Sequence, residues 1–264
     1  MKLYELIKNL EVKKIIGSLD VEITDIKIDS NLITKGCVFV CNKGKDDDGK
    51  NHIKQAEKYG AIAVVCSEEI NTSITQIIVE NTRKALSLLA SEFHNNPSKQ
   101  MKIIGVVGTN GKTTTAHLIS QLINFSGEKC GVIGTLGSFY DDKFIEPNLT
   151  TPDPTELHKT LAEMLNNGVK TVVMEVSAHA IFWDKVYGMD FEVGVFTNFS
   201  RDHLDFFQSM DEYKNAKLKF FKECNCKYIV VNSDDKVGVE ILGIKNGTIT
   251  YGVENPADVF AIKI

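Results

Sequence analysis

Residues 102–115 read KIIGVVGTNGKTTT, and this stretch organises the rest of the chain. Its first six residues are mostly apolar and predict a buried strand, and a helical pattern begins directly after the glycine-rich turn. Gly108 and Gly111 let backbone N–H groups turn inward around an anion. A helix that begins at such a turn adds partial positive charge at its N-terminus. The stretch therefore predicts a phosphate-binding loop.

Two side chains in this loop suit a nucleotide. Lys112 can reach the terminal phosphates, and the Thr113 hydroxyl can ligate Mg²⁺. The Walker A spacing would place its first glycine at the position of Val106, so the loop matches that motif only in part, with GKTT intact. We predict that the loop binds ATP or GTP, and the alternative is a turn with a purely structural role.

Beyond the loop, strand-like and helix-like segments alternate. Strands are expected for GVIGTLG at 131–137, TVVMEVS at 171–177, FEVGVFTN at 191–198 and KYIVVN at 227–232, and helices at 113–127, 155–167 and 211–223. GTITYG at 247–252 and ADVFAIKI at 257–264 add two strand-like pieces. Apolar strands that alternate with helices indicate a mostly parallel sheet covered by helices. The fold class is therefore α/β, with a P-loop ATPase-like domain over 100–264.

The residues before this domain predict a separate, mixed α/β domain. Helices are expected at 2–10, 51–59 and 81–94, strands within 21–28, at 37–41 and at 61–66, and a charged turn at 43–50. The segment NNPSK at 95–99 is the expected boundary, because it is polar and contains a proline. We therefore expect two domains, 1–99 and 100–264, which the length of 264 residues also favours.

The composition is that of an ordinary folded protein. Hydrophobic residues make up 43% and charged residues 25%, which argues against disorder, coiled coil and collagen. The net charge of -5 argues against a protein that lives on nucleic acid. Neither a signal peptide nor an apolar run long enough for membrane insertion occurs, so we expect a cytoplasmic protein. The six cysteines are expected as reduced, mostly buried thiols, and a metal or redox role for Cys224 and Cys226 is the alternative.

A glutamate interrupts the apolar segment 171–177. Glu175 falls near the carboxyl end of the expected strand, where a buried charge is costly unless it is paired or bound to metal. Ligands of open parallel sheets bind outside the carboxyl ends of the strands. We predict that Glu175 is a Mg²⁺ ligand, and the alternative is a carboxylate satisfied by a nearby lysine or by Ser177.

A histidine follows the next strand along the chain. His203 lies between Asp202 and Asp205, in a loop at the same end of the sheet. A loop histidine taken alone is more often a surface residue. Its place beside the other polar groups at strand ends favours a functional role.

The last helix expected in this domain carries an inward-facing lysine. At about 100° per residue, Lys217 falls in the middle of the apolar arc, one turn from Tyr213 and Phe221. Lys219 and Lys222 fall on the opposite face and are expected to be solvated. Burying an ammonium is costly, so Lys217 must meet an anion or lose its charge. The alternative is a lysine whose stem passes the aromatic rings to reach water.

Taken together, these motifs resemble the Mur ligases, the ATP-dependent amide-forming enzymes of peptidoglycan precursor synthesis. The matching segments are GVVGTNGKTTT at 105–115, LTTPDP at 149–154, EVSAHA at 175–180, FTNFSRDHLD at 196–205, YKNAK at 213–217 and VVNSDD at 230–235. The N-terminal part is similar to the MurE-type branch, which adds the third residue to UDP-N-acetylmuramoyl-L-Ala-D-Glu. The segments that carry this similarity are IDSNLITKGCVFV at 28–40, DDGKNHI at 47–53 and YGAIAVV at 59–65, together with LTTPDP.

The resemblance implies a role for each matching position. The loop that holds ATP in the family corresponds to Gly108, Thr109, Asn110, Gly111, Lys112, Thr113 and Thr114. The positions associated with Mg²⁺ and the nucleotide phosphates are Thr113, Glu175, His203 and Lys217, and the lysine that matches Lys217 is carbamoylated by CO₂. The positions that hold the UDP-muramoyl substrate are Thr150, Thr151, Ser177 and Lys185, with Ser30 near its uridine end. The implied catalytic set is Lys112, Glu175, His203 and Lys217.

Four positions depart from the pattern of the family. Ala178 stands where a second serine is usual. Lys185 stands where an arginine is usual, so bidentate recognition becomes a point charge. Trp183 occupies a place that is often polar, and Asn31 a place where arginine is frequent. These departures concern positions that bind the muramoyl substrate in the family. The positions that bind ATP and metal all keep the residues usual in the family.

The resemblance implies a UDP-sugar-binding domain, an ATP-binding domain and ligation through an acyl phosphate, by a monomer that uses UDP-N-acetylmuramoyl dipeptide and an amino acid. It also implies a third, C-terminal domain, which we expect this chain to lack. The chain is therefore expected to be a two-domain fragment, incomplete at the C-terminal edge of its central domain, with weak or absent ligation. The alternatives are another Mur-type or a folylpolyglutamate-type ligase, a GTPase-type switch, and a relative that only binds nucleotide or UDP-sugar. The sequence contains no guanine-selecting segment of the kind that a GTPase-type switch would need.

Overall fold

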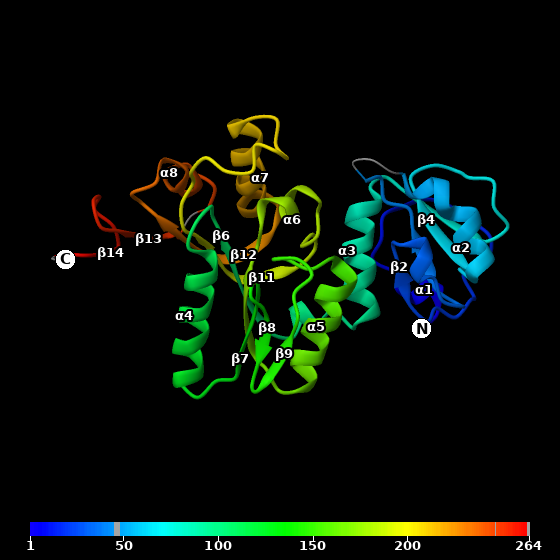
Figure 1. The fold of residues 1–264 in the computed structure, drawn as a ribbon, viewed down its shortest axis with the longest axis horizontal. Coiled ribbons are helices and arrows are strands. Elements are labelled where there is room, and N and C mark those ends of the chain that lie inside the picture. Colours follow the sequence, from blue (N-terminus) through cyan, green and yellow to red (C-terminus); the bar gives the residue numbers. More distant parts are fainter. Residues whose placement is uncertain (45–47, 246, 263–264) are drawn as a thin grey trace. The chain divides into compact units, whose positions relative to one another are not determined.

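The computed structural model describes residues 1–44, 48–245 and 247–262. They form two compact units, Met1–Asn96 and Pro97–Ile264, which Figure 1 traces along the chain. The division falls inside the polar segment 95–99, and η3, a short 3₁₀ helix (Pro97–Lys99), packs with the second unit. The middle of the charged turn at 43–50 and the last two residues of the tail lie outside the described residues.

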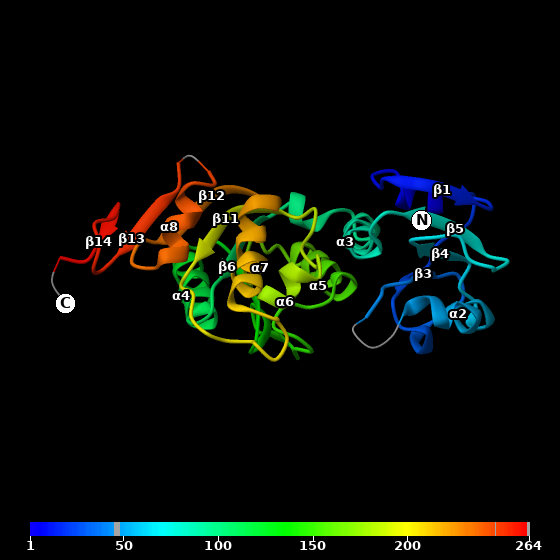
Figure 2. The ribbon, with the colours of Figure 1, turned by 90° about the horizontal axis from the view of Figure 1, so that it is seen from above.

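The first unit contains a five-stranded sheet in the order β1-β5-β4-β3-β2, and Figure 2 shows β1, β5, β4 and β3 in this order. The strands are β1 (Val12–Ile16), β2 (Ile26–Lys27), β3 (Val38–Val40), β4 (Ala63–Cys66) and β5 (Thr75–Val79). All run parallel except β1, which pairs antiparallel with β5. One face packs on α1 (Leu3–Leu6) and α3 (Thr82–Phe93), and the other packs on α2 (Ile53–Tyr59). The remaining turns are the 3₁₀ helices η1 (Ser30–Leu32) and η2 (Gly49–His52).

Parts of this unit differ from the sequence expectations. The helix expected at 2–10 ends at Leu6, because the chain turns and the Leu10 N–H donates to the Ile7 carbonyl. Within 21–28 only two residues form a strand. The sequence does not indicate β1, because its three central residues are exposed at the sheet edge and show no alternation. It does not indicate β5 either, although that strand is buried throughout.

The second unit is built on a nine-stranded sheet in the order β14-β13-β12-β11-β6-β10-β7-β8-β9. The strands are β6 (Lys102–Val107), β7 (Cys130–Gly134), β8 (Gly137–Tyr140), β9 (Lys143–Ile145), β10 (Thr171–Glu175), β11 (Asp190–Phe196), β12 (Asn225–Asn232), β13 (Ile249–Gly252) and β14 (Val259–Phe260). From β14 to β7 all strands run parallel, and β8 and β9 form an antiparallel hairpin at the edge. The expected α/β fold with a mostly parallel sheet is confirmed.

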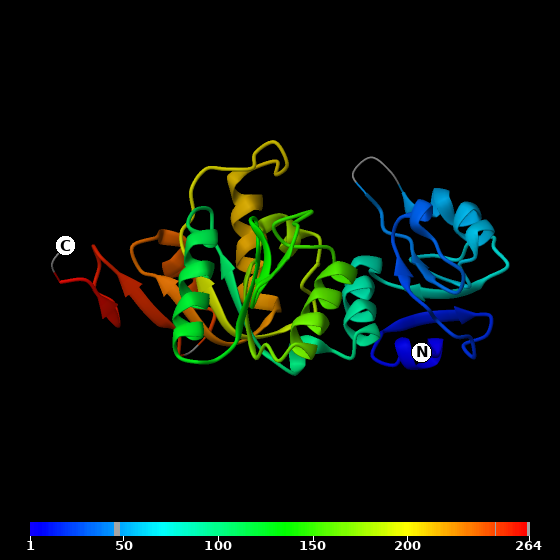
Figure 3. The same cartoon turned by 60° about the horizontal axis from the view of Figure 1, so that its bottom comes forward.

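Helices cover both faces of this sheet. α4 (Lys112–Phe125) packs on one face, where Figure 3 shows it in green, and α5 (Pro154–Asn166), α7 (Met210–Glu223) and α8 (Lys236–Leu242) pack on the other. The sequence pattern does not indicate α6 (Ala178–Phe182), α8 or the β8–β9 hairpin, because each is too short to show a period. Among the helices of the described residues, none combines the length and apolar character that crossing a bilayer requires.

The topology brings three loops to one edge of the sheet. β6 lies between β10 and β11, and all three strands run in the same direction. Val106 pairs with Glu175 on one side, and Val107 pairs with Phe196 on the other. The residues that follow these strands therefore leave the sheet side by side, at the edge where α/β proteins bind ligands.

Candidate functional site

The turn after β6 needs its glycines for two different reasons. A Cβ at Gly108 would stand 1.9 Å from Thr197 Oγ1, so the turn can pass the β11 loop only without a side chain there. Gly111 has a φ of +80°, in the left-handed region that favours glycine, and the next residue, Lys112, begins α4. The turn thus delivers a helix N-terminus directly beside the end of β6.

The loop after β11 holds this turn through reciprocal hydrogen bonds. The Asn110 N–H donates to Asn198 Oδ1 at 3.0 Å, and Asn198 Nδ2 donates to the Asn110 carbonyl at 3.0 Å. The Thr109 N–H donates to the Asn198 carbonyl at 2.8 Å, and Thr197 Oγ1 donates to the Asn110 carbonyl at 2.7 Å. Sequence reasoning missed Asn198 as a positioning residue, because its partners lie far away along the chain.

Lys112 folds back over the turn. Its Nζ donates to the carbonyls of Gly108 at 3.1 Å and Thr109 at 2.8 Å. Burial lowers the pKa of Lys112, while the charges of Glu175 and Asp202 oppose this shift. The ammonium lies at the head of the loop, where the terminal phosphates of a nucleotide would be within its reach.

Glu175 ends β10 as a buried carboxylate, with 1% of its surface exposed. Its Oε2 accepts hydrogen bonds from Thr113 Oγ1 at 2.9 Å and Thr135 Oγ1 at 3.3 Å, and its Oε1 accepts from the Thr135 N–H at 2.8 Å. A Cβ at Gly134 would stand 2.2 Å from Oε1, so the end of β7 must be bare for this carboxylate to fit. Sequence reasoning missed Thr135, because the expected strand 131–137 ends three residues early.

A second group of hydroxyls lies beside Glu175. Thr151 Oγ1 donates to the Glu175 carbonyl at 2.8 Å and accepts from the Ser177 N–H at 3.0 Å. The Thr150 and Thr135 hydroxyls are 3.1 Å apart. Ser177 also caps α6 by accepting from the Ala180 N–H.

A basic residue follows α6. Lys185 Nζ lies 2.8 Å from Asp153 Oδ1, and only 14% of its side chain is exposed. Asp153 directly precedes α5, so the ion pair joins two segments that the sequence singles out, LTTPDP and the residues after EVSAHA.

His203 lies in the third loop with a φ of +52° and with its Nε2 3.5 Å from Asp202 Oδ2. Its ring stands edge-on to the ring of His179, with 4.8 Å between centroids, and also contacts Tyr213. Burial lowers the pKa of His179, and the nearby His203 adds to this shift. Sequence reasoning missed His179, although it lies inside the quoted segment EVSAHA.

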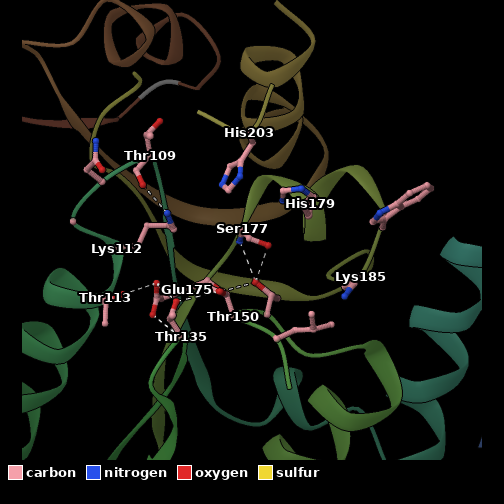
Figure 4. A pocket seen from close by; sticks show the side chains of 15 residues that line it. Thr109, Lys112, Thr113, Thr135, Thr150, Glu175, Ser177, His179, Lys185 and His203 are labelled. Atoms are coloured by element: carbon pink, nitrogen blue, oxygen red, sulfur yellow. Dashed lines mark hydrogen bonds between the residues drawn. The ribbon is translucent and has the colours of Figure 1, made fainter. Parts of the chain in front are cut away.

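These groups line one cavity of about 550 Å³. Figure 4 shows Lys112 and Thr113 on the left, Lys185 on the right, and Glu175 and Ser177 between them. The cavity brings together eleven residues expected from the sequence: Thr109, Asn110, Gly111, Lys112, Thr113, Thr150, Thr151, Glu175, Ser177, Lys185 and His203. It also includes Thr135, Leu149, His179 and Trp183. The volume is in the range typical of small-molecule sites.

Lys217 is not among the residues that line this cavity. It contacts the phosphate loop through the backbone of Gly108. The side chain is 1% exposed, and its Nζ donates to the Gly108 carbonyl at 2.7 Å and lies 4.3 Å from the centroid of the Tyr213 ring. Burial lowers its pKa from 10.5 to about 7, and the charge of Lys112 adds to this shift. The side chain points inward, as the helical pattern predicts, and does not reach water.

The expectation for Lys219 is wrong. Instead of being solvated, Lys219 Nζ forms an ion pair with Asp184 Oδ1 at 2.7 Å, and 27% of its side chain is exposed. The helical pattern places Lys219 on the polar face correctly but carries no information about α6, which supplies the partner. Lys222 is exposed as expected.

Three other expected residues are not part of the cavity lining. Gly108 lies in the phosphate loop, where its carbonyl accepts hydrogen bonds from Lys112 and Lys217. Ser30, in the first unit, is 5% exposed, and its Oγ donates to Gln55 Oε1 at 3.2 Å. Thr114 lies on the exposed side of α4. All six cysteines are free, and the described residues contain no cluster of metal-ligating side chains around Cys224 and Cys226 or elsewhere.

Comparison with known proteins identifies relatives of this chain. The family described as Mur ligase middle domain matches residues 106–264, and the one described as Mur ligase family, catalytic domain, matches residues 22–94. The chain is 38% identical over 273 residues to the UDP-N-acetylmuramoyl-L-alanyl-D-glutamate--2,6-diaminopimelate ligase of Bacillus licheniformis, and 40% identical over 267 residues to the ligase of the same name from Alkaliphilus oremlandii.

These alignments cover 100% and 99% of this chain but 56% and 54% of the two relatives, so the chain spans about half the length of the curated relatives that it matches. A solved structure described as a ligase of the same name has a TM-score of 0.84 at 24% identity, over 98% of this chain and 54% of that one, which shows a common fold. The middle-domain match alone spans more than half of the chain. The chain therefore belongs to the Mur ligase family.

Proposed function

We propose that the chain is the nucleotide- and muramoyl-binding part of an ATP-dependent ligase that adds the third amino acid to UDP-N-acetylmuramoyl-L-Ala-D-Glu. One observation carries the proposal: a single cavity is lined by Lys112 and Thr113 and also by Thr150, Ser177 and Lys185. A phosphoryl group held by the loop and a carboxylate held by the other wall would share one small volume. The curated relatives, which are named for this substrate and for 2,6-diaminopimelate, support the choice of substrate.

The nucleotide belongs at the phosphate loop. The backbone N–H groups at the N-terminus of α4, from Gly111 to Thr114, would receive the phosphates, and Lys112 would offset charge on the terminal one. ATP rather than GTP is proposed, on the basis of the family.

The oxygen groups beside the loop fit a magnesium ion. In phosphoryl-transfer sites Mg²⁺ is held by one or two carboxylates together with substrate phosphates, so a complete protein cage is not required. Glu175 is a buried carboxylate on the cavity wall, already oriented by three hydrogen bonds. Thr113, Glu175 and His203, which line the cavity, are proposed ligands. Carbamoylated Lys217 is proposed as a fourth on the basis of the family resemblance, because the unmodified side chain lies outside the cavity lining. When bound, the ion would neutralise charge on the transferring phosphoryl group.

Lys217 is proposed to be carbamoylated. Because its pKa is lowered to about 7, a large share of the side chain is a neutral amine near neutral pH. A neutral amine attacks the carbon of CO₂ and releases a proton, which leaves a carbamate with a carboxylate-like end. The carbamate is an anion, which is favourable beside Lys112, whereas the protonated amine would be an unfavourable buried cation there.

The proposed reaction has two steps. The substrate carboxylate attacks the γ-phosphorus of ATP, ADP leaves, and an acyl phosphate forms. The amine of the amino acid then attacks the acyl carbon and loses a proton, and phosphate leaves as the amide bond forms. Lys112 stabilises charge in the first step, and no nucleophile of the chain is needed.

The remaining parts of the proposal concern the muramoyl substrate and the two units. Thr150, Thr151, Ser177 and Lys185 would hold its muramoyl-peptide part, and Ser30 would lie near its uridine end. On this assignment residues 1–99 are the UDP-sugar-binding domain and 100–264 the ATP-binding domain. Monomeric state, which the family resemblance implies, and the cytoplasmic location expected from the sequence are further parts of the proposal.

Calorimetry on this chain tests the proposal. We expect Mg²⁺-dependent binding of a non-hydrolysable ATP analogue, and separate binding of UDP-N-acetylmuramoyl-L-Ala-D-Glu that UDP-N-acetylglucosamine does not match. Lys112→Met should weaken only the nucleotide, and Ser177→Ala only the muramoyl substrate. In the full-length ligase, phosphate release should require both the muramoyl dipeptide and an amino acid. Release that is indifferent to the muramoyl dipeptide would rule out this ligase, and nucleotide binding without muramoyl binding would favour a different substrate.

A further inference from the structure

The C-terminal end of α6 contains an aspartate in an unusual backbone conformation. The Asp184 N–H donates to the Ile181 carbonyl, and the Lys185 N–H donates to the Ala180 carbonyl at 2.9 Å, which is the hydrogen-bond pattern of a Schellman motif. The residue that ends the helix in this motif adopts the left-handed backbone conformation, and Asp184 has a φ of +55°. Glycine is the usual residue at such a position, because any side chain there is strained.

The side chain of Asp184 explains why a residue other than glycine is useful there. This side chain is 8% exposed, and its Oδ1 lies 2.7 Å from Lys219 Nζ on α7. Burying a carboxylate costs free energy unless the carboxylate is paired with a cation. A movement of α6 relative to α7 would break this pair, so the pair favours the observed arrangement of the two helices. The two helices are in contact, and Figure 2 shows them side by side.

The position of this ion pair in the chain connects it to the cavity. Asp184 lies between Trp183 and Lys185, and both of these neighbours line the cavity. Lys219 lies two residues beyond Lys217, whose side chain points to the other side of α7 and contacts the phosphate loop. The ion pair therefore ties the segment that carries Lys185 to the helix that carries Lys217.

We propose that the Asp184–Lys219 ion pair is a positioning device that aims the Lys185 ammonium into the cavity, so that it can bind an anionic group of the muramoyl substrate. Asp153 Oδ1 contacts the Lys185 ammonium directly, at 2.8 Å. Without the Asp184–Lys219 pair, the turn after α6 loses this polar link to α7, and Lys185 gains freedom to leave Asp153 and point to water. The part of the inference that concerns the substrate rests on the proposed function. The part that concerns the position of Lys185 does not.

Chemical labelling tests the position of Lys185 without any substrate. Lys185 is 14% exposed and ion-paired, so its acetylation by an N-hydroxysuccinimide ester, followed by peptide mass spectrometry, should be slow in the wild type. Asp184→Gly removes the carboxylate and relieves the left-handed backbone, so this variant should fold. We expect Lys185 to react roughly tenfold faster in Asp184→Gly and in Lys219→Met. In Lys219→Arg, which keeps a cation opposite Asp184, the acetylation of Lys185 should remain as slow as in the wild type.

A matched control lies on the same helix. Lys214 is also 27% exposed and forms an ion pair with Glu240, away from the turn after α6. Lys214→Met should leave the acetylation of Lys185 unchanged. Unchanged labelling of Lys185 in folded Asp184→Gly would overturn the inference, since the ion pair would then hold nothing in place.

Calorimetry then tests the consequence for binding. In Asp184→Gly and Lys219→Met the dissociation constant of UDP-N-acetylmuramoyl-L-Ala-D-Glu should rise roughly tenfold, and that of the Mg²⁺–ATP analogue should not change. Equal weakening of both ligands would mean a general loosening of the unit and would contradict a specific positioning role. If the wild type does not bind the muramoyl dipeptide at all, the proposed function fails, and the labelling result still decides the position of Lys185.

Discussion

Lys217 allows a quantitative test, because its buried charge couples folding to pH. Burial, reinforced by the charge of Lys112 and opposed by that of Asp202, lowers its pKa from 10.5 to about 7. The perturbation is Lys217→Met, which keeps a long side chain and removes the titrating group. Buffers purged of CO₂ keep the wild-type side chain as an amine.

The sign of the effect follows from the two pKa values. The unfolded chain holds the proton up to about pH 10.5, whereas the folded chain releases it near pH 7. Between these values the unfolded state binds more protons, so the free energy of unfolding rises with pH by about 1.4 kcal/mol per pH unit. The penalty for burying the ammonium is fully present below about pH 7 and disappears as the pH rises toward 10.5.

Urea unfolding of both proteins at several pH values measures this effect. From about pH 7.5 to about pH 9, the free energy of unfolding of the wild type should rise by about 2 kcal/mol relative to that of Lys217→Met. Taking the difference removes the contributions of other groups that titrate equally in both proteins. Lys214→Met, which removes an ion-paired and partly exposed lysine from the same helix, should follow the wild type.

A difference between wild type and Lys217→Met that stays flat over this range would refute the reasoning. It would mean that Lys217 keeps its proton in the folded chain and finds an anion or water to solvate it. A difference that falls with pH would mean that the folded state stabilises the ammonium. Either result would also remove the basis for carbamoylation, which needs the neutral amine.

Gly134→Ala should displace the Glu175 carboxylate, since a Cβ there would stand 2.2 Å from its Oε1, and calorimetry should show weaker Mg²⁺-dependent nucleotide binding; unchanged binding would contradict the role of this carboxylate. Asn198→Ala removes two side-chain hydrogen bonds to the phosphate loop and should weaken nucleotide binding roughly tenfold, with the affinity for the muramoyl dipeptide preserved. Lys112→Ala should abolish measurable nucleotide binding at an unchanged fold, and retained affinity would disprove the loop assignment. With ¹³C-bicarbonate, the NMR spectrum of the wild type should contain a carbamate resonance that Lys217→Met lacks.

Much of the phosphate-loop end of the site can be predicted from the sequence, because its information is local. The strand, the turn and the start of the helix lie within 102–115, and each glycine acts through its own backbone. Glu175 and His203 are predictable for a different reason. Both follow apolar strand segments, and parallel topology brings the carboxyl ends of such strands to one edge.

The partners that hold these groups in place cannot be read in the same way. The hydrogen bonds between Asn110 and Asn198 join residues 88 positions apart. Thr135 binds Glu175 across 40 positions, and only because β7 ends at Gly134. A periodic pattern reports which side of an element is buried, but it carries no information on which distant segment covers that side.

Lys217 and Lys219 show how far this limit reaches within one helix. Lys217 interrupts an apolar arc, so the cost of its charge is visible in the sequence, and the structure meets that cost by shifting its pKa. Lys219 lies on a polar face, where a lysine ordinarily costs nothing, and yet it is paired with Asp184. That pairing depends on a left-handed turn at the end of a five-residue helix, which no periodicity reveals. Charges that interrupt a pattern can therefore be found from the sequence, whereas charges that obey it can be assigned a role only once the opposing element is known.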